Sequence, residues 1–104
     1  MEGLGIVARF TLKPGKEAEF DRLTAEAAEG IRAHEPGTLF YATHRMVEAP
    51  SSRVFYELYR DRSAFEAHLK QPHVQRLLDA SSELVDSQTV DFLDLTDGKL
   101  PPVR

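Results

Sequence analysis

The chain contains no cysteine, and no apolar run in it approaches the length needed to cross a membrane. Without cysteine, disulfide bonds and thiolate metal sites are excluded, which fits a reducing compartment. Residues 1–9 lack a basic region followed by a long apolar one, as in signal peptides. We therefore expect a cytoplasmic protein with no membrane partner.

Runs of like charge are also absent, although acidic residues are in excess. The sequence has 13 Lys and Arg against 17 Asp and Glu, a formal net charge of −4, so nucleic acid is not an expected partner. No Gly-rich phosphate-binding loop occurs, and His68 and His73 are five residues apart across Pro72 rather than at the i, i+4 spacing of zinc helices. We expect no cofactor and no metal, haem or flavin.

Length and composition are those of one globular domain. The 104 residues, of which 41% are hydrophobic and 29% charged, are enough for a thin core. We expect a single domain over residues 1–104, with an extended tail from about residue 97 to 104.

Apolar periodicity predicts four strands and two helical regions, the second of them bent or split at Pro72. Ser63 and Glu66 are spaced as a capping box for its first part, and residues 49–52 are predicted as a hairpin loop. The predicted strands cover residues 4–12, 38–48, 53–60 and 88–96, and the helices cover residues 17–33, 63–69 and 73–85.

This order predicts an α+β, ferredoxin-like split βαβ fold with a four-stranded antiparallel sheet. Right-handed crossovers place both helical regions on one face of that sheet. The middle strands carry apolar residues on both faces, so the helix-free face needs covering. We expect a second copy of the chain to cover it, which makes the protein a homodimer.

The strand at residues 53–60 carries an acidic residue among aromatics. Its side chains alternate between two faces, with Val54, Tyr56 and Leu58 on one and Phe55, Glu57 and Tyr59 on the other. His68 falls on the apolar face of the following helix, where an imidazole that titrates near neutrality can accept a proton. Glu57 can orient that imidazole or act as the base itself.

Other polar side chains could assist this pair, and simpler explanations remain open. Tyr41 and Arg45 share a strand face and could hold a developing oxyanion. Alternatively, His68 is a structural histidine and Glu57 pairs across the sheet with Arg9 or Arg45.

Several motifs together resemble the antibiotic biosynthesis monooxygenase domains of the dimeric α+β barrel superfamily. They are the first strand with its Lys13-Pro14-Gly15 turn, Glu35-Pro36-Gly37 leading into Tyr41, Phe55-Tyr56-Glu57-Leu58-Tyr59, Ala64, His68 and Pro72-His73. The resemblance spans nearly the whole chain, and it implies the ferredoxin-like fold and a dimeric α+β barrel.

Members of that family differ in chemistry, which includes cofactor-free oxidation of polyphenols, quinone metabolism, isomerisation of a phosphorylated sugar derivative and haem degradation. Haem-degrading members have Asn where this chain has Ala8, Trp where it has His68, and an iron-binding His near Leu78. Haem degradation is therefore not expected unless His73 ligates the iron.

The resemblance implies a cofactor-independent monooxygenase that acts on an aromatic, polyphenolic or quinonoid molecule with dioxygen. We predict His68 and Glu57 as catalytic residues, and as substrate contacts Tyr41, Arg45, Tyr59, His73 and Phe65. One alternative is an isomerase or quinone-handling enzyme that uses the same base, and another is a non-catalytic small-molecule-binding dimer. A pocket that encloses Glu57 and His68 together favours an enzyme.

Overall fold

The computed structural model describes residues 3–100, and within them it has four strands and three helices. In chain order these are β1 (Leu4–Leu12), α1 (Glu17–His34), β2 (Thr38–Met46), β3 (Ala49–Tyr59), α2 (Arg62–Leu69), α3 (Pro72–Leu84) and β4 (Val85–Asp94). The strand order in the sheet is β2-β3-β1-β4, with every neighbouring pair antiparallel. This confirms the predicted α+β, ferredoxin-like fold.

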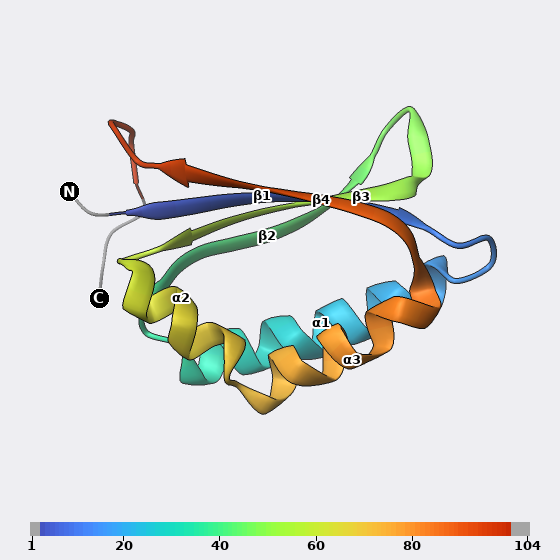
Figure 1. Cartoon of the computed structure of the whole chain (residues 1–104), viewed down its shortest axis with the longest axis horizontal. Coiled ribbons are helices and arrows are strands. Elements are labelled where there is room, and N and C mark those ends of the chain that lie inside the picture. Colours follow the sequence, from blue (N-terminus) through green and yellow to red (C-terminus); the bar gives the residue numbers. More distant parts are fainter. Residues whose placement is uncertain (1–2, 101–104) are drawn as a thin grey trace.

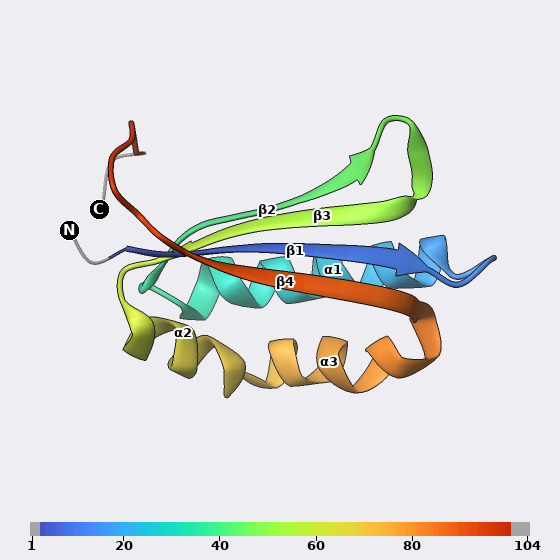
Figure 2. The same ribbon diagram turned by 45° about the horizontal axis from the view of Figure 1, so that its top comes forward.

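All three helices lie on the same face of the sheet, as Figures 1 and 2 show. Lys70 and Gln71 separate α2 from α3, and α3 begins at Pro72 because proline fits a helix start but not a helix interior. The predicted one-sided arrangement and the split second helical region are both confirmed.

The core lies between α1 and the sheet. The buried stripe of α1 consists of Phe20, Leu23, Thr24, Ala27 and Ile31, at the spacing that brings one helix face against a layer. Phe10 of β1 links the two layers, with its ring centroid 5.5 Å from Phe20 and 4.9 Å from Phe55. None of the helices within residues 3–100 is long and apolar enough to cross a membrane.

The N-terminus of α2 differs from the prediction. Its cap is Asp61, whose carboxylate accepts the backbone N–H of Ala64 at 2.9 Å. Ser63 lies inside the first turn and donates its hydroxyl to Asp61 instead. The capping box of Ser63 with Glu66 is wrong because an aspartate two residues earlier is an equally good cap and satisfies the free amide first.

Two other boundaries are displaced. Residues 47 and 48 form the turn between β2 and β3, so the predicted loop at residues 49–52 belongs to β3. Pro50 is tolerated there because it lies beyond the register in which β3 pairs with β1, which begins at Ser52. The strand β4 begins at Val85 and ends at Asp94, two or three residues before the predicted limits.

The segment after β4 covers one end of the helix-free face. Leu95 donates its backbone N–H to the carbonyl of Gly3 at 3.0 Å, and residues 95–100 line a shallow hollow with Phe40, Tyr56 and the buried Leu58. Of the tail predicted at about residues 97–104, residues 101–104 lie outside the described part of the chain. The rest of the helix-free face carries no other cover within residues 3–100 (Figure 1).

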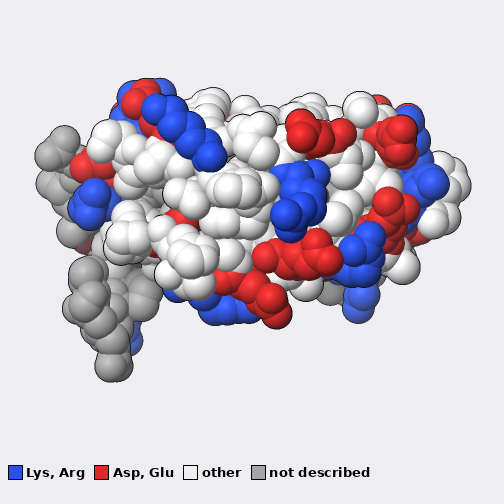
Figure 3. Space-filling model, turned by 90° about the horizontal axis from the view of Figure 1, so that it is seen from below, with Lys and Arg blue, Asp and Glu red and all other residues white. Residues whose placement is uncertain are grey.

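Charges of both signs are intermixed on the helix-covered side. Figure 3 shows Lys and Arg next to Asp and Glu across this view, separated by uncharged surface. No basic patch forms on the face shown there, which agrees with the net charge of −4.

Candidate functional site

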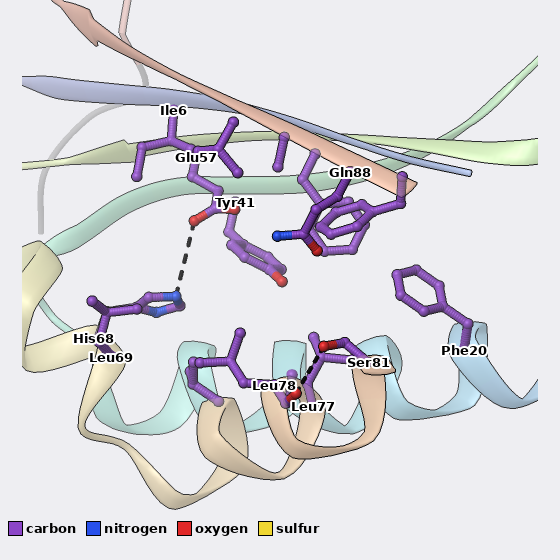
Figure 4. A pocket seen from close by; sticks show the side chains of 16 residues that line it. Ile6, Phe20, Tyr41, Glu57, His68, Leu69, Leu77, Leu78, Ser81 and Gln88 are labelled. Atoms are coloured by element: carbon purple, nitrogen blue, oxygen red, sulfur yellow. Dashed lines mark hydrogen bonds and ion pairs between the residues drawn. The ribbon is translucent and has the colours of Figure 1, made fainter. Parts of the chain in front are cut away.

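A cavity of about 180 Å³ lies between the sheet and the helices. Its walls are mainly apolar and come from β1, β2, β3 and β4 above and from α1, α2 and α3 below (Figure 4). Glu57 and His68 both line it, from opposite layers. The structure therefore encloses the two predicted catalytic residues in one pocket.

Glu57 occupies the helix-covered face of the sheet, which the sequence left open. Its cross-strand neighbours are Ile6 and Tyr41. Arg9 is opposite Val54 and so points to the other face, while Arg45 is opposite Arg53. Glu57 therefore does not pair with Arg9 or Arg45 across the sheet, and that alternative is wrong.

The Glu57 carboxyl is held by a neighbouring phenol. Tyr59, two residues along the same face of β3, donates its hydroxyl to Oε1 of Glu57 at 2.5 Å. Burial raises the pKa of the Glu57 carboxyl, and the hydrogen bond from Tyr59 offsets only part of that effect. Burial and the nearby carboxylate also raise the pKa of Tyr59, which keeps it a hydrogen-bond donor.

His68 projects from the last turn of α2 toward Glu57. Its Nδ1 lies 2.7 Å from Oε1 of Glu35, and its Nε2 lies 3.9 Å from Oε1 of Glu57. The first distance is that of a charge-assisted hydrogen bond, whereas the second is too long for one. Since a carboxylate can only accept, Nδ1 carries a proton, and in the neutral imidazole the lone pair is on Nε2, which faces Glu57 and the cavity (Figure 4).

Glu35, which the sequence analysis noted only as part of the Glu35-Pro36-Gly37 motif, is the carboxylate that contacts Nδ1 of His68. It sits at the C-cap of α1 and accepts three hydrogen bonds: from Thr38 Oγ1 at 2.7 Å, from His68 Nδ1 and from His73 Nε2 at 2.5 Å. Burial acts to raise the pKa of Glu35, but the donors on Thr38, His73 and His68 outweigh it and hold that pKa below its ordinary value. His68 thus lies between two carboxyl groups. Glu35, beside Nδ1, has a lowered pKa, and Glu57, on the side of Nε2, has a raised pKa.

One sequence signal could have identified Glu35. A negative charge at the C-terminal end of a helix opposes the helix dipole, so a carboxylate there is unfavourable unless donors compensate for it. In the described residues every buried side-chain nitrogen and oxygen has a hydrogen-bond partner, Glu35 included.

No group of three or more His, Asp or Glu side chains within residues 3–100 is arranged to hold a metal ion.

Tyr41 and two residues that the sequence analysis missed supply the remaining polar groups. The Tyr41 ring projects from β2 into the space between sheet and helices (Figure 4), and burial raises the pKa of its phenol, which therefore stays a donor. Gln88 of β4 points its amide into the same space, and Ser81 of α3 lies on the opposite wall, where its hydroxyl donates to the Leu78 carbonyl at 2.8 Å. The cavity thus has polar groups beyond the Glu57–His68 end.

The other predicted substrate contacts lie outside the cavity. Arg45 is exposed, and it lies toward the β2–β3 turn, away from Glu57. Tyr59 and Phe65 pack behind His68, with ring centroids 5.1 Å and 6.4 Å from its imidazole. His73 binds Glu35 rather than the cavity. Of the predicted site residues, the structure brings Glu57, His68 and Tyr41 together.

Comparison with known proteins places this arrangement in a family. The family model described as antibiotic biosynthesis monooxygenase matches residues 3–80. An uncharacterized protein from Synechocystis sp. is 28% identical over 80 residues, which cover 77% of this chain and 54% of that protein. The chain therefore spans about half the length of this curated relative.

Two solved structures are closely similar in fold. A protein from Caulobacter crescentus CB15, named as a candidate antibiotic biosynthesis monooxygenase, is 25% identical with a TM-score of 0.86 and 92% of each chain covered. A protein from Pseudomonas aeruginosa is 24% identical with a TM-score of 0.85, and 93% of this chain and 97% of that chain are covered. The second of these similarities concerns the fold alone.

Proposed function

Because this chain belongs to the antibiotic biosynthesis monooxygenase family, we propose that it is a cofactor-independent monooxygenase of an aromatic or quinonoid small molecule. One observation carries the proposal: Nε2 of His68 faces the Glu57 carboxyl across 3.9 Å inside an apolar cavity. A base with a free lone pair beside a buried acid is suited to removing a proton from a bound phenol.

The cavity volume supports a small aromatic substrate. A dry apolar cavity of about 150 Å³ accommodates benzene, and the cavity here measures about 180 Å³. Aromatic rings of Phe20, Phe55 and Tyr41 line it and offer faces and edges to a planar ligand. A phenol or hydroquinone with one or two rings fits these walls.

The proposed reaction begins with a proton transfer. A substrate hydroxyl between Glu57 and His68 gives its proton to Nε2 of His68, and the Glu35 carboxylate stabilises the imidazolium through Nδ1. The substrate anion is electron-rich and reduces dioxygen. One oxygen atom bonds to a ring carbon and the other leaves as water. The two hydrogens of that water are the proton held by His68 and the hydrogen displaced from the ring carbon, so the substrate is the only reductant required.

Neighbouring groups would favour the anion in this step. Tyr41 is a neutral phenol at the cavity wall and can donate a hydrogen bond to the substrate oxygen. Glu57 is the carboxyl whose pKa burial raises, so its protonated form can donate to the same oxygen. In that form Glu57 adds no negative charge next to the substrate anion.

An oxygen-uptake assay tests the proposal. Purified protein is mixed with a panel of phenols, naphthols and hydroquinones, and dioxygen consumption is followed together with the mass of the products. We expect at least one phenol to consume one dioxygen per molecule and to gain one oxygen atom on losing two hydrogens. Binding of the panel with neither oxygen uptake nor conversion would contradict the proposal, and conversion without oxygen uptake would favour an isomerase.

We also propose that the protein is a homodimer joined through the helix-free face of the sheet. Phe40 and Leu93 are about 40% exposed on that face, while Val7, Val54 and Tyr56 are half-buried beside them. Within residues 3–100 only the segment at residues 95–100 lies over it, at one end. A second copy would bury the remaining apolar surface.

Replacing Phe40 by Asp is expected to convert the dimer to monomer at micromolar concentration, because it places a charge in the apolar contact. Light scattering across a dilution series measures the mass. The control is Val47→Asp, which introduces the same charge at an almost fully exposed turn residue and should leave the dimer unchanged. A wild-type protein that is a folded monomer at micromolar concentration would contradict the proposal.

A further inference from the structure

His73 contacts the site from outside the cavity. It is the second residue of α3, its side chain is only 11% exposed, and its Nε2 lies 2.5 Å from Oε2 of Glu35. It is not among the residues that line the cavity. The His73 imidazole therefore neither contacts a ligand in the cavity nor lies in solvent, so its position needs another explanation.

The chain has a specific slot for the His73 ring. Gly30 lies in the interior of α1, and a Cβ atom at that position would come within 2.3 Å of Cγ and 2.4 Å of Nδ1 of His73. Glycine weakens a helix interior, so its presence here requires a compensating reason. The reason is that any side chain at residue 30 would displace His73 from Glu35.

We infer that His73 is a positioning residue, which acts through Glu35 to hold His68 in the tautomer whose Nε2 is free. This inference deepens the proposed function, because a free Nε2 is what makes His68 a base. His73 is not a catalytic residue in this scheme, since it touches neither the cavity nor the reacting atoms.

The hydrogen bonds of Glu35 explain how the effect is transmitted. Thr38 and His68 both donate to Oε1, whereas His73 is the donor to Oε2. Without His73, Oε2 would be a buried acceptor with no partner, and the carboxylate would no longer be fixed with Oε1 toward His68. Nδ1 of His68 would then lose the fixed acceptor that keeps its proton there, and the tautomer with the proton on Nε2, facing the cavity, would gain population.

Few other charged or titratable groups bear on this arrangement. Glu57 of β3 faces the other side of His68, at 3.9 Å from Nε2. His34 at the end of α1 is exposed, and its ring centroid lies 6.3 Å from that of His73. Because His34 is a neighbour of His73 with no hydrogen bond to Glu35, it provides a matched control.

The test compares His73→Asn with His73→Gln. The side-chain amide nitrogen of Gln occupies about the position of Nε2 of histidine and can donate to Oε2 of Glu35, whereas that of Asn corresponds to Nδ1 and cannot reach it. Imidazole ¹⁵N NMR on the full chain reports the tautomer of His68 without any substrate. His34→Gln serves as the control.

We expect His68 to carry its proton on Nδ1 in the wild type, in His34→Gln and in His73→Gln. In His73→Asn the population with the proton on Nε2 should become substantial, and kcat should fall about 10-fold with little change in KM, the low end of the loss that follows removal of an outer-shell partner of a metal-bound histidine. An unchanged His68 tautomer in folded His73→Asn would overturn the inference. The NMR result stands apart from the proposed function, because inactivity of the wild type would leave the tautomer measurable.

Discussion

His68→Ala is expected to lower turnover by about 10²–10⁴-fold, the contribution of a positioned acid or base. In the structure the imidazole Nε2 is the free basic nitrogen that faces the cavity, and the substitution removes it. KM should change much less than kcat, since the apolar walls that would bind the ring remain. Steady-state kinetics on a substrate found by the oxygen-uptake screen measures both quantities.

His68→Asn separates this loss from a structural one. The Asn amide nitrogen lies near the position of Nδ1 and can still donate to Glu35, but nothing replaces Nε2. We therefore expect a variant that is more stable than His68→Ala and equally inactive. Turnover close to wild type in either folded variant would exclude His68 as the base, and a lowered melting temperature with unchanged activity per folded molecule would indicate a structural histidine.

The fold could be predicted because it depends on local patterns. The alternation in residues 4–12 and the three- and four-residue spacing of Phe20, Leu23, Ala27 and Ile31 each specify one element and its buried face. The element order then leaves few topologies. Cap and turn positions were less certain, because Asp61 and Ser63 are both good caps and only the packed helix decides between them.

The site was only partly predictable for a related reason. Alternation places Arg45 on the same strand face as Tyr41, which is opposite Glu57, but it does not show how far across the sheet the cavity extends. Arg45 is opposite Arg53, four residues and about 13 Å along β3 from Glu57. At that level of the sheet the cavity is lined from β1 and β4, by Phe10 and Gln88, whereas Arg45 lies on the edge strand β2 and is exposed, so the shared face did not bring Arg45 to the site.

Glu35 was missed because its contacts are distant in the sequence. It meets His68 of α2 and His73 of α3 across separations of 33 and 38 residues, and the packing of α1 against α3 brings His73 to it. The sequence offered Glu57 as the partner of His68, since an acid among aromatics is conspicuous. The structure instead has Glu35 behind the imidazole and Glu57 in front of it.

Glu35→Ala is therefore expected to be the most destabilising single change in the site, lowering the free energy of unfolding by about 2–4 kcal/mol. It leaves the donors of Thr38, His68 and His73 without their acceptor, and an unsatisfied buried donor costs about 1–3 kcal/mol before water compensates. For a chain of this size, the melting temperature should fall by about 10–20 °C. The control is Glu29→Ala on the exposed side of α1, where the expected change is within about 0.5 kcal/mol.

The difference between wild type and Glu35→Ala should also depend on pH. The pKa of Glu35 in the folded protein is below its ordinary value of 4.5, so the carboxylate stabilises the fold above that value and loses this contribution as the pH falls through the folded-state pKa. Urea unfolding of both proteins at pH 7 and at successively lower pH values below 4.5 should show the gap narrowing. A gap that is constant or widens on acidification would mean that Glu35 is not held as the anion, and the orientation of His68 by a carboxylate would then have to be abandoned.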